Sequence, residues 1–261
     1  MKRYEWFRFT AFLIVLFLII TASAGGVLAA DPAQIIHKRP RAEKTDVTPW
    51  CTMTTPGGGL FRYQVLGLRL DWGDNYGVKG TTKIRQPYVH EGSHNLNSVS
   101  LITPNGYVEN GWVAERYSGG QPNYWFFVQI SRWGVPYETM IPISYYLFNT
   151  NQIFEIRQDT SSNPRWDFYI GLYQYPHEWW MSTYYLGGQR PTSQVEGCTP
   201  WDWLYTRWWS LQYIPDQNGS FQTWPQLDIG RSYTPGTSFC WYGQKLSNDS
   251  WKSYYVSNGN C

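Results

Sequence analysis

The sequence predicts an all-β protein, folded as a single antiparallel β-sandwich. Aromatic residues form 19% of the chain against 15% charged residues, and Trp, Tyr and Phe suit pleated strands better than helices. The 24 glycines and 16 prolines disfavour long helices. Short apolar runs separated by turn-forming residues complete the pattern, which is typical of a sandwich or a barrel.

The first 30 residues have the order of a secretory signal peptide. Basic residues precede an apolar run at 9–20, and small residues follow it up to position 30. A retained membrane anchor is the alternative, but the run is shorter than the roughly 20 residues that a membrane-spanning helix needs. We therefore expect cleavage, a secreted protein and no transmembrane segment in the mature chain.

Two further segments follow this leader. Residues 31–50 are rich in Lys, Arg and Pro and almost free of aromatic residues, which predicts a basic, flexible tether. Residues 51–261 contain no internal repeat and no second linker, so we expect one domain. Four widely spaced cysteines in an exported chain predict two disulfides and leave the pairing open. They are Cys51, Cys198, Cys240 and Cys261.

Within this domain, alternating or continuous apolar runs predict strands. In chain order the expected strands are 61–70, 97–102, 124–130, 153–157, 166–170 and 205–213. Turn-forming Gly, Pro and Asn residues lie between them, at 104–106, 118–120, 162–164 and 216–219. Neighbouring residues of a strand face opposite ways, so one ring of the pair Trp208-Trp209 is expected to lie outside the core.

The charge excludes nucleic acid as a partner. The chain carries a net charge of +2, and this excess lies in the leader, because basic and acidic residues balance beyond position 30. Binding to nucleic acid needs a basic face or stripe, which this composition does not provide.

One motif matches the His-Glu-x-x-His pattern of zinc peptidases, from His90 to His94. That pattern binds zinc on a helix, where residues i and i+4 project to the same side. Gly and Ser occupy the middle of this motif, Pro87 precedes it, and apolar residues alternate from Val99 onward. We therefore predict a loop followed by a strand and no metal site. Zinc held by His90 and His94 is the alternative.

An ordered set of motifs begins at residue 76. It consists of Tyr76-Gly-Val, Pro87-Tyr-Val, the serine-rich Ser98-Val-Ser-Leu-Ile, Glu109-Asn-Gly-Trp and the aromatic Tyr124-Trp-Phe-Phe-Val. This order resembles the neprosin domain. The likeness spans about residues 76–227 and is strongest up to residue 130.

The resemblance implies a β-sandwich whose groove holds two catalytic glutamates, in a glutamic peptidase that favours proline and acid conditions. Glu109 matches the first of these glutamates. The family's later Gly-Gly-Glu corresponds to Gly187-Gly-Gln189, which has an amide in place of the carboxylate, and Glu196 follows seven residues later. Glu196 is thus the candidate second glutamate. If Gln189 faces Glu109 instead, the assignment becomes a glutamine and glutamate pair.

Such a pair has a coherent chemistry. Two glutamates that face each other cannot both ionise easily, so they share a proton. The ionised one deprotonates a water that attacks an amide carbonyl, and the protonated one donates to the departing nitrogen. Gln189 or Gln194 is positioned in the sequence to hydrogen-bond the oxyanion, and Trp112 is a further groove candidate. The reaction needs no cofactor, and its partner is a peptide or protein substrate.

Other interpretations of the same residues remain open. Glu109 also fits an outward strand position paired with a base such as Arg116, and Glu196 fits a loop beside a disulfide. Trp112 fits the core of a sandwich. Exposed Trp and Tyr rings with few charges also suit a secreted module without catalytic activity that binds a polysaccharide or a proline-rich peptide.

Overall fold

The computed structural model describes residues 63–69, 75–103, 106–117, 119–132, 135–143, 145–159, 165–171, 176–182, 190–217, 219–233 and 239–256. The chain divides into two compact units, residues 1–36 and 37–261, and every described residue belongs to the second unit. The predicted signal peptide at 1–30 and the tether at 31–50 lie outside the described residues, so both stay predictions.

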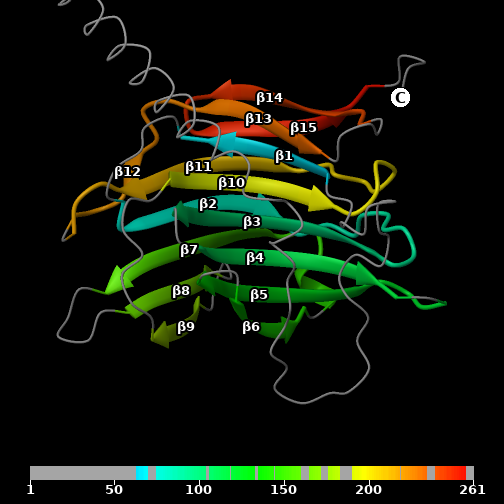
Figure 1. Ribbon diagram of the computed structural model, residues 1–261, viewed down its shortest axis with the longest axis horizontal. Helices are drawn as coiled ribbons and strands as arrows, with labels where there is room; N and C mark the ends of the chain where they lie inside the picture. Colours follow the sequence, from blue (N-terminus) through cyan, green and yellow to red (C-terminus); the bar gives the residue numbers. More distant parts are fainter. Residues whose placement is uncertain are drawn as a thin grey trace, which may run out of the picture. The chain divides into compact units, whose positions relative to one another are not determined.

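Two antiparallel sheets build this unit (Figure 1). The seven-stranded sheet has the order β13 (Asp228–Tyr233), β1 (Tyr63–Leu68), β10 (Arg190–Gly197), β3 (Ser93–Thr103), β4 (Gly106–Arg116), β5 (Asn123–Arg132) and β6 (Val135–Pro142). The eight-stranded sheet has the order β14 (Trp241–Ser247), β15 (Ser250–Tyr255), β11 (Arg207–Ile214), β2 (Gly77–Lys83), β7 (Asn151–Asp159), β8 (Arg165–Gly171) and β9 (Pro176–Ser182), with β12 (Gln222–Thr223) paired to β11. The predicted all-β sandwich is confirmed.

All six strands that the sequence pattern predicted are present, as β1, β3, β5, β7, β8 and β11. The pattern missed the other nine strands that the structure describes, among them β10, which carries Gln194 and Glu196. Every residue of β10 after Arg190 is buried. A strand that is buried on both faces loses the alternation of apolar and polar residues that would identify it.

The core lies between the two sheets. Alternate residues of facing strands fill it, including Val99, Trp112 and Val128 from the seven-stranded sheet and Phe154 and Trp208 from the eight-stranded sheet. Trp209 is only partly buried, so the prediction that one ring of this pair lies outside the core is confirmed.

Asn110 of β4 crosses between the sheets. Its Nδ2 donates to the backbone carbonyls of Glu155, at 3.0 Å, and of Tyr169, at 2.9 Å, on β7 and β8. A side chain that is completely buried needs such partners, because an unpaired polar group in a core costs about 1–3 kcal/mol. These two bonds also establish which face of β4 points toward the second sheet.

A β-bulge interrupts β11. Ser210 and Leu211 together face the single residue Gly80 of β2, and Ser210 has a positive φ of 53°. The extra residue changes which positions face inward, since Trp208, Leu211 and Tyr213 are all buried in the core. Helical structure among the described residues is limited to the single 3-10 turn Tyr145–Leu147 (η2), and no helix there is long and apolar enough to cross a membrane.

Gly111 of β4 lies close against the backbone of β3, which yields a stability prediction. A Cβ at this position would lie 2.1 Å from the carbonyl oxygen of Asn97 and 2.7 Å from the Cα of Ser98. We expect Gly111→Ala to lower the free energy of unfolding by about 1–3 kcal/mol or more, because two backbones must move apart. Urea denaturation measures this change.

The matched control is Gly120→Ala, whose added Cβ would come no closer than 3.6 Å to its nearest neighbour. A change within about 0.5 kcal/mol is expected there. Equal losses in the two variants would contradict a specific close approach at Gly111.

Candidate functional site

A row of polar side chains lies on the face of the seven-stranded sheet that points away from the eight-stranded sheet. Asn110, Val195 and Val65 point into the core, so strand alternation turns Glu109 and Glu196 to the opposite face. The same alternation places Gln64, Gln194, Ser98 and His94 there as well, on β1, β10 and β3. Four neighbouring strands thus bring these six side chains to one surface of the sheet.

Two donors to Glu109 lie in the described part of the chain. Gln194 Nε2 donates to Glu109 Oε1 at 2.5 Å, and Ser98 Oγ donates to the same oxygen. The strand register explains both contacts. On β3, Ser98 lies opposite Gln194 of β10, and Ser100, two residues later on the same face, lies opposite Glu109 of β4. Glu109 is only 3% exposed, so both donors act at short range and away from bulk water.

Glu196 is held by a different pair of groups. Gln64 lies directly opposite it on β1 and donates from Nε2 to Glu196 Oε2 at 2.5 Å. His94 Nε2 lies 3.5 Å from Glu196 Oε1. Gln64 Nε2 also lies 3.2 Å from Gln194 Oε1. Gln194 and Gln64 therefore link the two glutamates, and Gln194 is a direct hydrogen-bond partner of Glu109.

His94 contributes to this network through Glu196. It lies in β3, its Nδ1 is 3.2 Å from Cys198 Sγ, and it is fully buried. His90 precedes the strand, where its ring contacts Tyr88 and Trp201. The predicted loop and strand are thus confirmed. The described residues contain no group of three or more His, Cys, Asp or Glu side chains able to hold a metal.

Asp202 ties the start of β3 to the segment that follows β10. Its carboxylate accepts from Ser93 Oγ at 2.5 Å, from the Thr199 amide at 2.8 Å and from the His90 amide at 2.8 Å. Burial raises the pKa of Asp202 above its ordinary value of 3.8, and these hydrogen bonds oppose the rise. Asp202 thereby fixes the end of the sheet that carries His94.

The structure separates the other predicted site residues from this network. Trp112 is buried in the sandwich core, on the face of β4 opposite Glu109. Gln189 lies outside the described residues, as do Cys51 and Cys261. Cys198 and Cys240 are buried, and no described cysteine is a free thiol. The pairing of the four cysteines stays a prediction.

Sequence reasoning missed Gln64 and Ser98 as site residues and singled out His94 for a different chemistry. A signal for Gln64 was present, since it is a polar residue in the middle of the predicted strand 61–70. Nothing in the sequence shows that this strand lies beside β10, because the two are 130 residues apart and their pairing is a property of the folded sheet.

The network combines a carboxylate with an amide donor a hydrogen bond away. Such a carboxylate can take a proton from water, and such an amide N–H can stabilise an oxyanion. The second carboxylate, through Gln64, keeps the amide of Gln194 oriented with its N–H groups toward Glu109. Hydrolysis of a carbonyl compound needs no more groups than these.

Comparisons with known proteins give structural neighbours only. No protein-family model matches the chain and no curated protein matches it, so the resemblance to the neprosin domain stays a prediction. Among solved structures, SCP-B, a member of the eqolisin family of peptidases in complex with the tripeptide Ala-Ile-His, has 10% identity and a TM-score of 0.49. Two structures of scytalido-glutamic peptidase also match. The structure with a bound peptide-based transition state analog has 9% identity and a TM-score of 0.48, and the structure with a bound transition state analog inhibitor has 8% identity and a TM-score of 0.49. Each match covers 76% of this chain and 98% of the other. TM-scores below 0.5 do not establish a shared fold, so the sandwich assignment stands on the strand pairing itself.

The raised pKa of Asp202 predicts a pH-dependent stability. A carboxyl whose pKa is higher in the folded state contributes most to the free energy of unfolding when the pH is below its ordinary pKa of 3.8. This contribution is lost as the pH rises through the raised pKa. We expect the free energy of unfolding, relative to that of Asp202→Asn, to fall as the pH rises from 3 to 7. The fall should be about 1.4 kcal/mol for each unit of pKa difference.

Urea denaturation of both proteins across this pH range provides the measurement. The asparagine variant does not titrate and also loses acceptors for Ser93 and Thr199, which adds an offset independent of pH. Two profiles that remain parallel over the whole range would show that Asp202 does not titrate differently on folding.

Proposed function

We propose that the protein is a secreted endopeptidase of the glutamic type, in which Glu109 activates a water molecule and Gln194 stabilises the oxyanion. The observation that carries this proposal is the 2.5 Å hydrogen bond from Gln194 Nε2 to Glu109 Oε1 on one face of the sheet. Its support from the sequence is the Glu109-Asn-Gly-Trp motif and the leader that predicts export.

The reaction proceeds in two steps with the groups of this network. Ionised Glu109 takes a proton from water while the water oxygen forms a bond to the amide carbon, and Gln194 Nε2 donates to the resulting oxyanion. Glu109 then gives the proton to the amide nitrogen, the C–N bond breaks, and the carbonyl re-forms as a carboxylic acid. No nucleophilic Ser or Cys enters this scheme.

Glu196 acts as a positioning residue. It accepts from Gln64, Gln64 contacts Gln194, and Gln194 donates to Glu109. This chain of contacts keeps the amide of Gln194 from rotating, because its oxygen already faces Gln64. The predicted pair of glutamates thus becomes a glutamate and glutamine pair supported by a second glutamate. A preference for proline and for acid conditions follows from the neprosin resemblance.

Digestion of a denatured proline-rich protein between about pH 3 and 5, where carboxyl groups titrate, tests the activity. We expect Glu109→Gln to lower the rate by about 10²–10⁴ and Gln194→Met by about 10²–10³, measured by mass spectrometry of the peptides formed. Glu155→Gln is the matched control, since Glu155 pairs with Arg157 on the other sheet and should retain full activity. Equal products from wild type and Glu109→Gln, or none from wild type, would remove the peptidase proposal.

Glu196→Gln tests the positioning role separately. We expect a smaller loss of rate than in Glu109→Gln, because the new amide still fills the site beside Gln64. We also expect the pH profile of kcat/KM to change. A loss as large as that of Glu109→Gln, with the shape of the profile unchanged, would instead make Glu196 a direct participant in the reaction.

A second candidate function is binding without catalysis, to a polysaccharide or a peptide. The observation that favours it is the exposure of two large rings, Trp201 at 63% and Trp203 at 59%. Contiguous exposed aromatic surface of this kind marks interaction sites. Binding to a polysaccharide by a chain that shows no digestion at any pH would establish this function in place of the first.

A further inference from the structure

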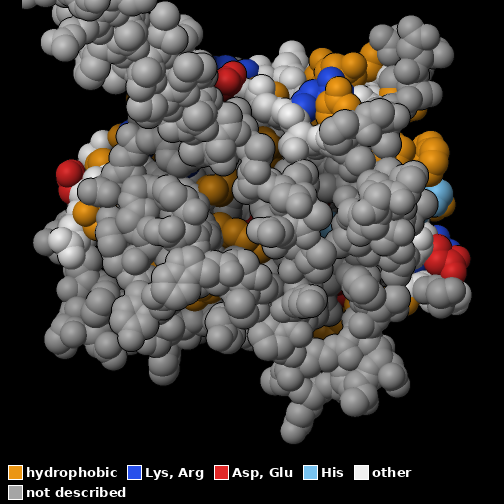
Figure 2. Space-filling view, in the orientation of Figure 1, with side chains coloured by type: hydrophobic (Ala, Val, Ile, Leu, Met, Phe, Trp, Pro, Cys, Tyr) orange, Lys and Arg blue, Asp and Glu red, His pale blue; other side chains and the backbone are white. Residues whose placement is uncertain are grey.

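A cleft of about 730 Å³ has no side chain of the carboxylate network in its lining. It is formed by loop residues before β3 and after β10, together with residues at the ends of β14 and β15. The lining residues are Arg85, Gln86, Pro87, Asn149, Pro200, Trp201, Trp203, Tyr205, Trp241 and Tyr255. Figure 2 shows hydrophobic side chains and a histidine at this end of the molecule, at the right edge of the view.

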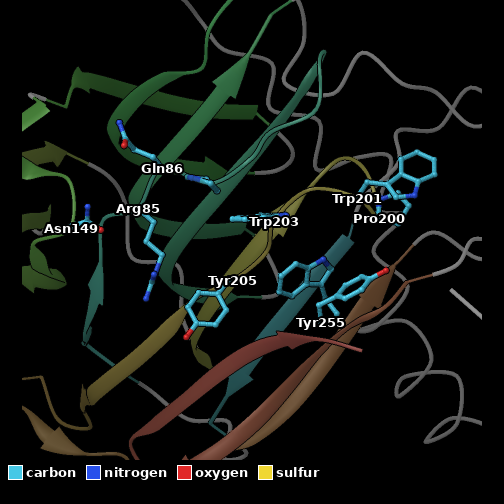
Figure 3. Close-up of a pocket in the computed structure, with 10 residues that line it drawn as sticks. Arg85, Gln86, Asn149, Pro200, Trp201, Trp203, Tyr205 and Tyr255 are labelled. Carbon is cyan, nitrogen blue, oxygen red and sulfur yellow. The ribbon is translucent and has the colours of Figure 1, made fainter. Parts of the chain in front are cut away.

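Five of these ten residues are aromatic, and four of the rings are strongly exposed. Trp201, Trp203, Tyr205 and Tyr255 are between 41% and 63% exposed. In Figure 3 the rings of Trp203, Tyr205 and Tyr255 lie between one end of the cleft at Arg85 and the other end at Trp201. A cleft of this volume, walled by rings and edged by a few polar groups, has the dimensions of a ligand site.

The walls are preformed by backbone hydrogen bonds. The amide of Trp203 donates to the carbonyl of Tyr88 at 3.1 Å, and the amide of Asn149 donates to the carbonyl of Ile84 at 2.8 Å. Asn149 adopts a positive φ of 65°, a conformation that asparagine tolerates better than most residues. A ligand that binds here does not have to order these loops first, which favours affinity.

Arg85 is the one charged residue of the lining, and none of the ten is acidic. Its guanidinium lies 4.5 Å from the centre of the Tyr205 ring, and its Nε is buried without a hydrogen-bond partner in the described part of the chain. No salt bridge of Arg85 occurs among those residues. The buried Nε is not available to a ligand, but the terminal nitrogens of a guanidinium suit a carboxylate, which can accept an N–H bond from each of them.

We propose that this cleft binds an acidic oligosaccharide built of uronic acid units. The flat C–H faces of sugar rings pack on Trp203 and Tyr205, while Gln86 and Asn149 hydrogen-bond hydroxyl groups and Arg85 receives a uronate carboxylate. A proline-rich peptide also matches aromatic walls but offers a carboxylate to Arg85 only at its C-terminus or at an acidic residue. A uronate chain presents both a ring and a carboxylate in every unit.

This site is separable from the proposed hydrolysis. Glu109, Gln194 and Glu196 are not among the residues that line the cleft, although Pro200 to Tyr205 lie a few residues beyond the strand that carries Glu196. Occupancy of the cleft would hold the protein on an acidic polysaccharide while the carboxylate network remains free to act. The proposal therefore stands or falls independently of the peptidase activity.

Titration calorimetry with oligogalacturonides at about pH 6, where uronate carboxyls are ionised, tests the proposal. The same oligomers with methyl-esterified carboxyl groups are the matched ligand. We expect Arg85→Gln to weaken binding of the acidic oligomer at least about tenfold and to leave binding of the ester unchanged. In the wild-type protein, the ester should bind at least about tenfold more weakly than the acidic oligomer. Trp203→Ala should weaken binding of both ligands at least about tenfold.

Two control variants lie outside the cleft. Arg207→Gln removes an exposed arginine and Tyr145→Ala an exposed ring, and neither is expected to change affinity. Glu109→Gln is expected to bind like wild type, and Arg85→Gln to digest a soluble peptide like wild type. Absence of binding to either oligomer, or no effect of Trp203→Ala, would overturn the site. Equal affinity for acid and ester would overturn the role of Arg85, and selective binding of a proline-rich peptide would assign the cleft to peptides instead.

Discussion

The period of two along β4 is the constraint on which the site depends. Trp112 and Asn110 face the second sheet, one filling the core and the other bonding to the backbones of β7 and β8. Once these two residues are fixed, Glu109 has to face the other way. A shift of β4 by one residue would put the carboxylate into the core and the indole on the outer face, so core packing specifies the site as strongly as it specifies the fold.

The fold followed from the sequence more readily than the site did. Aromatic runs such as 124–130 carry their own strand signal, and each one became a strand because a sandwich core requires such residues. Gln64 and Gln194 carry no local signal of this kind. They matter because β1 and β10 pair, and the pairing of segments 130 residues apart is not written in either one. Even Glu196 was found by its distance from a motif rather than by a pattern in β10 itself.

Side-chain amides donate hydrogen bonds to both buried glutamates of this site. Glu109 and Glu196 are each 3% exposed; Gln194 and Ser98 donate to Glu109, and Gln64 donates to Glu196. By contrast, the partly exposed Glu155 pairs with Arg157. Amide donors orient the carboxylate, and their hydrogen bonds favour its ionised form, which a general base needs.

The bulge in β11 has a consequence for how related chains should be aligned. The pair Ser210 and Leu211 facing Gly80 means that β11 contains one residue more than its neighbour needs. A relative that lacks this residue would keep Trp208 inward and, by simple alternation, would place an inward residue where Ser210 stands here. A correct alignment of two such chains therefore requires a one-residue gap inside a strand, where gaps are ordinarily avoided. An alignment without this gap would pair core residues with exposed ones from Leu211 to the end of β11.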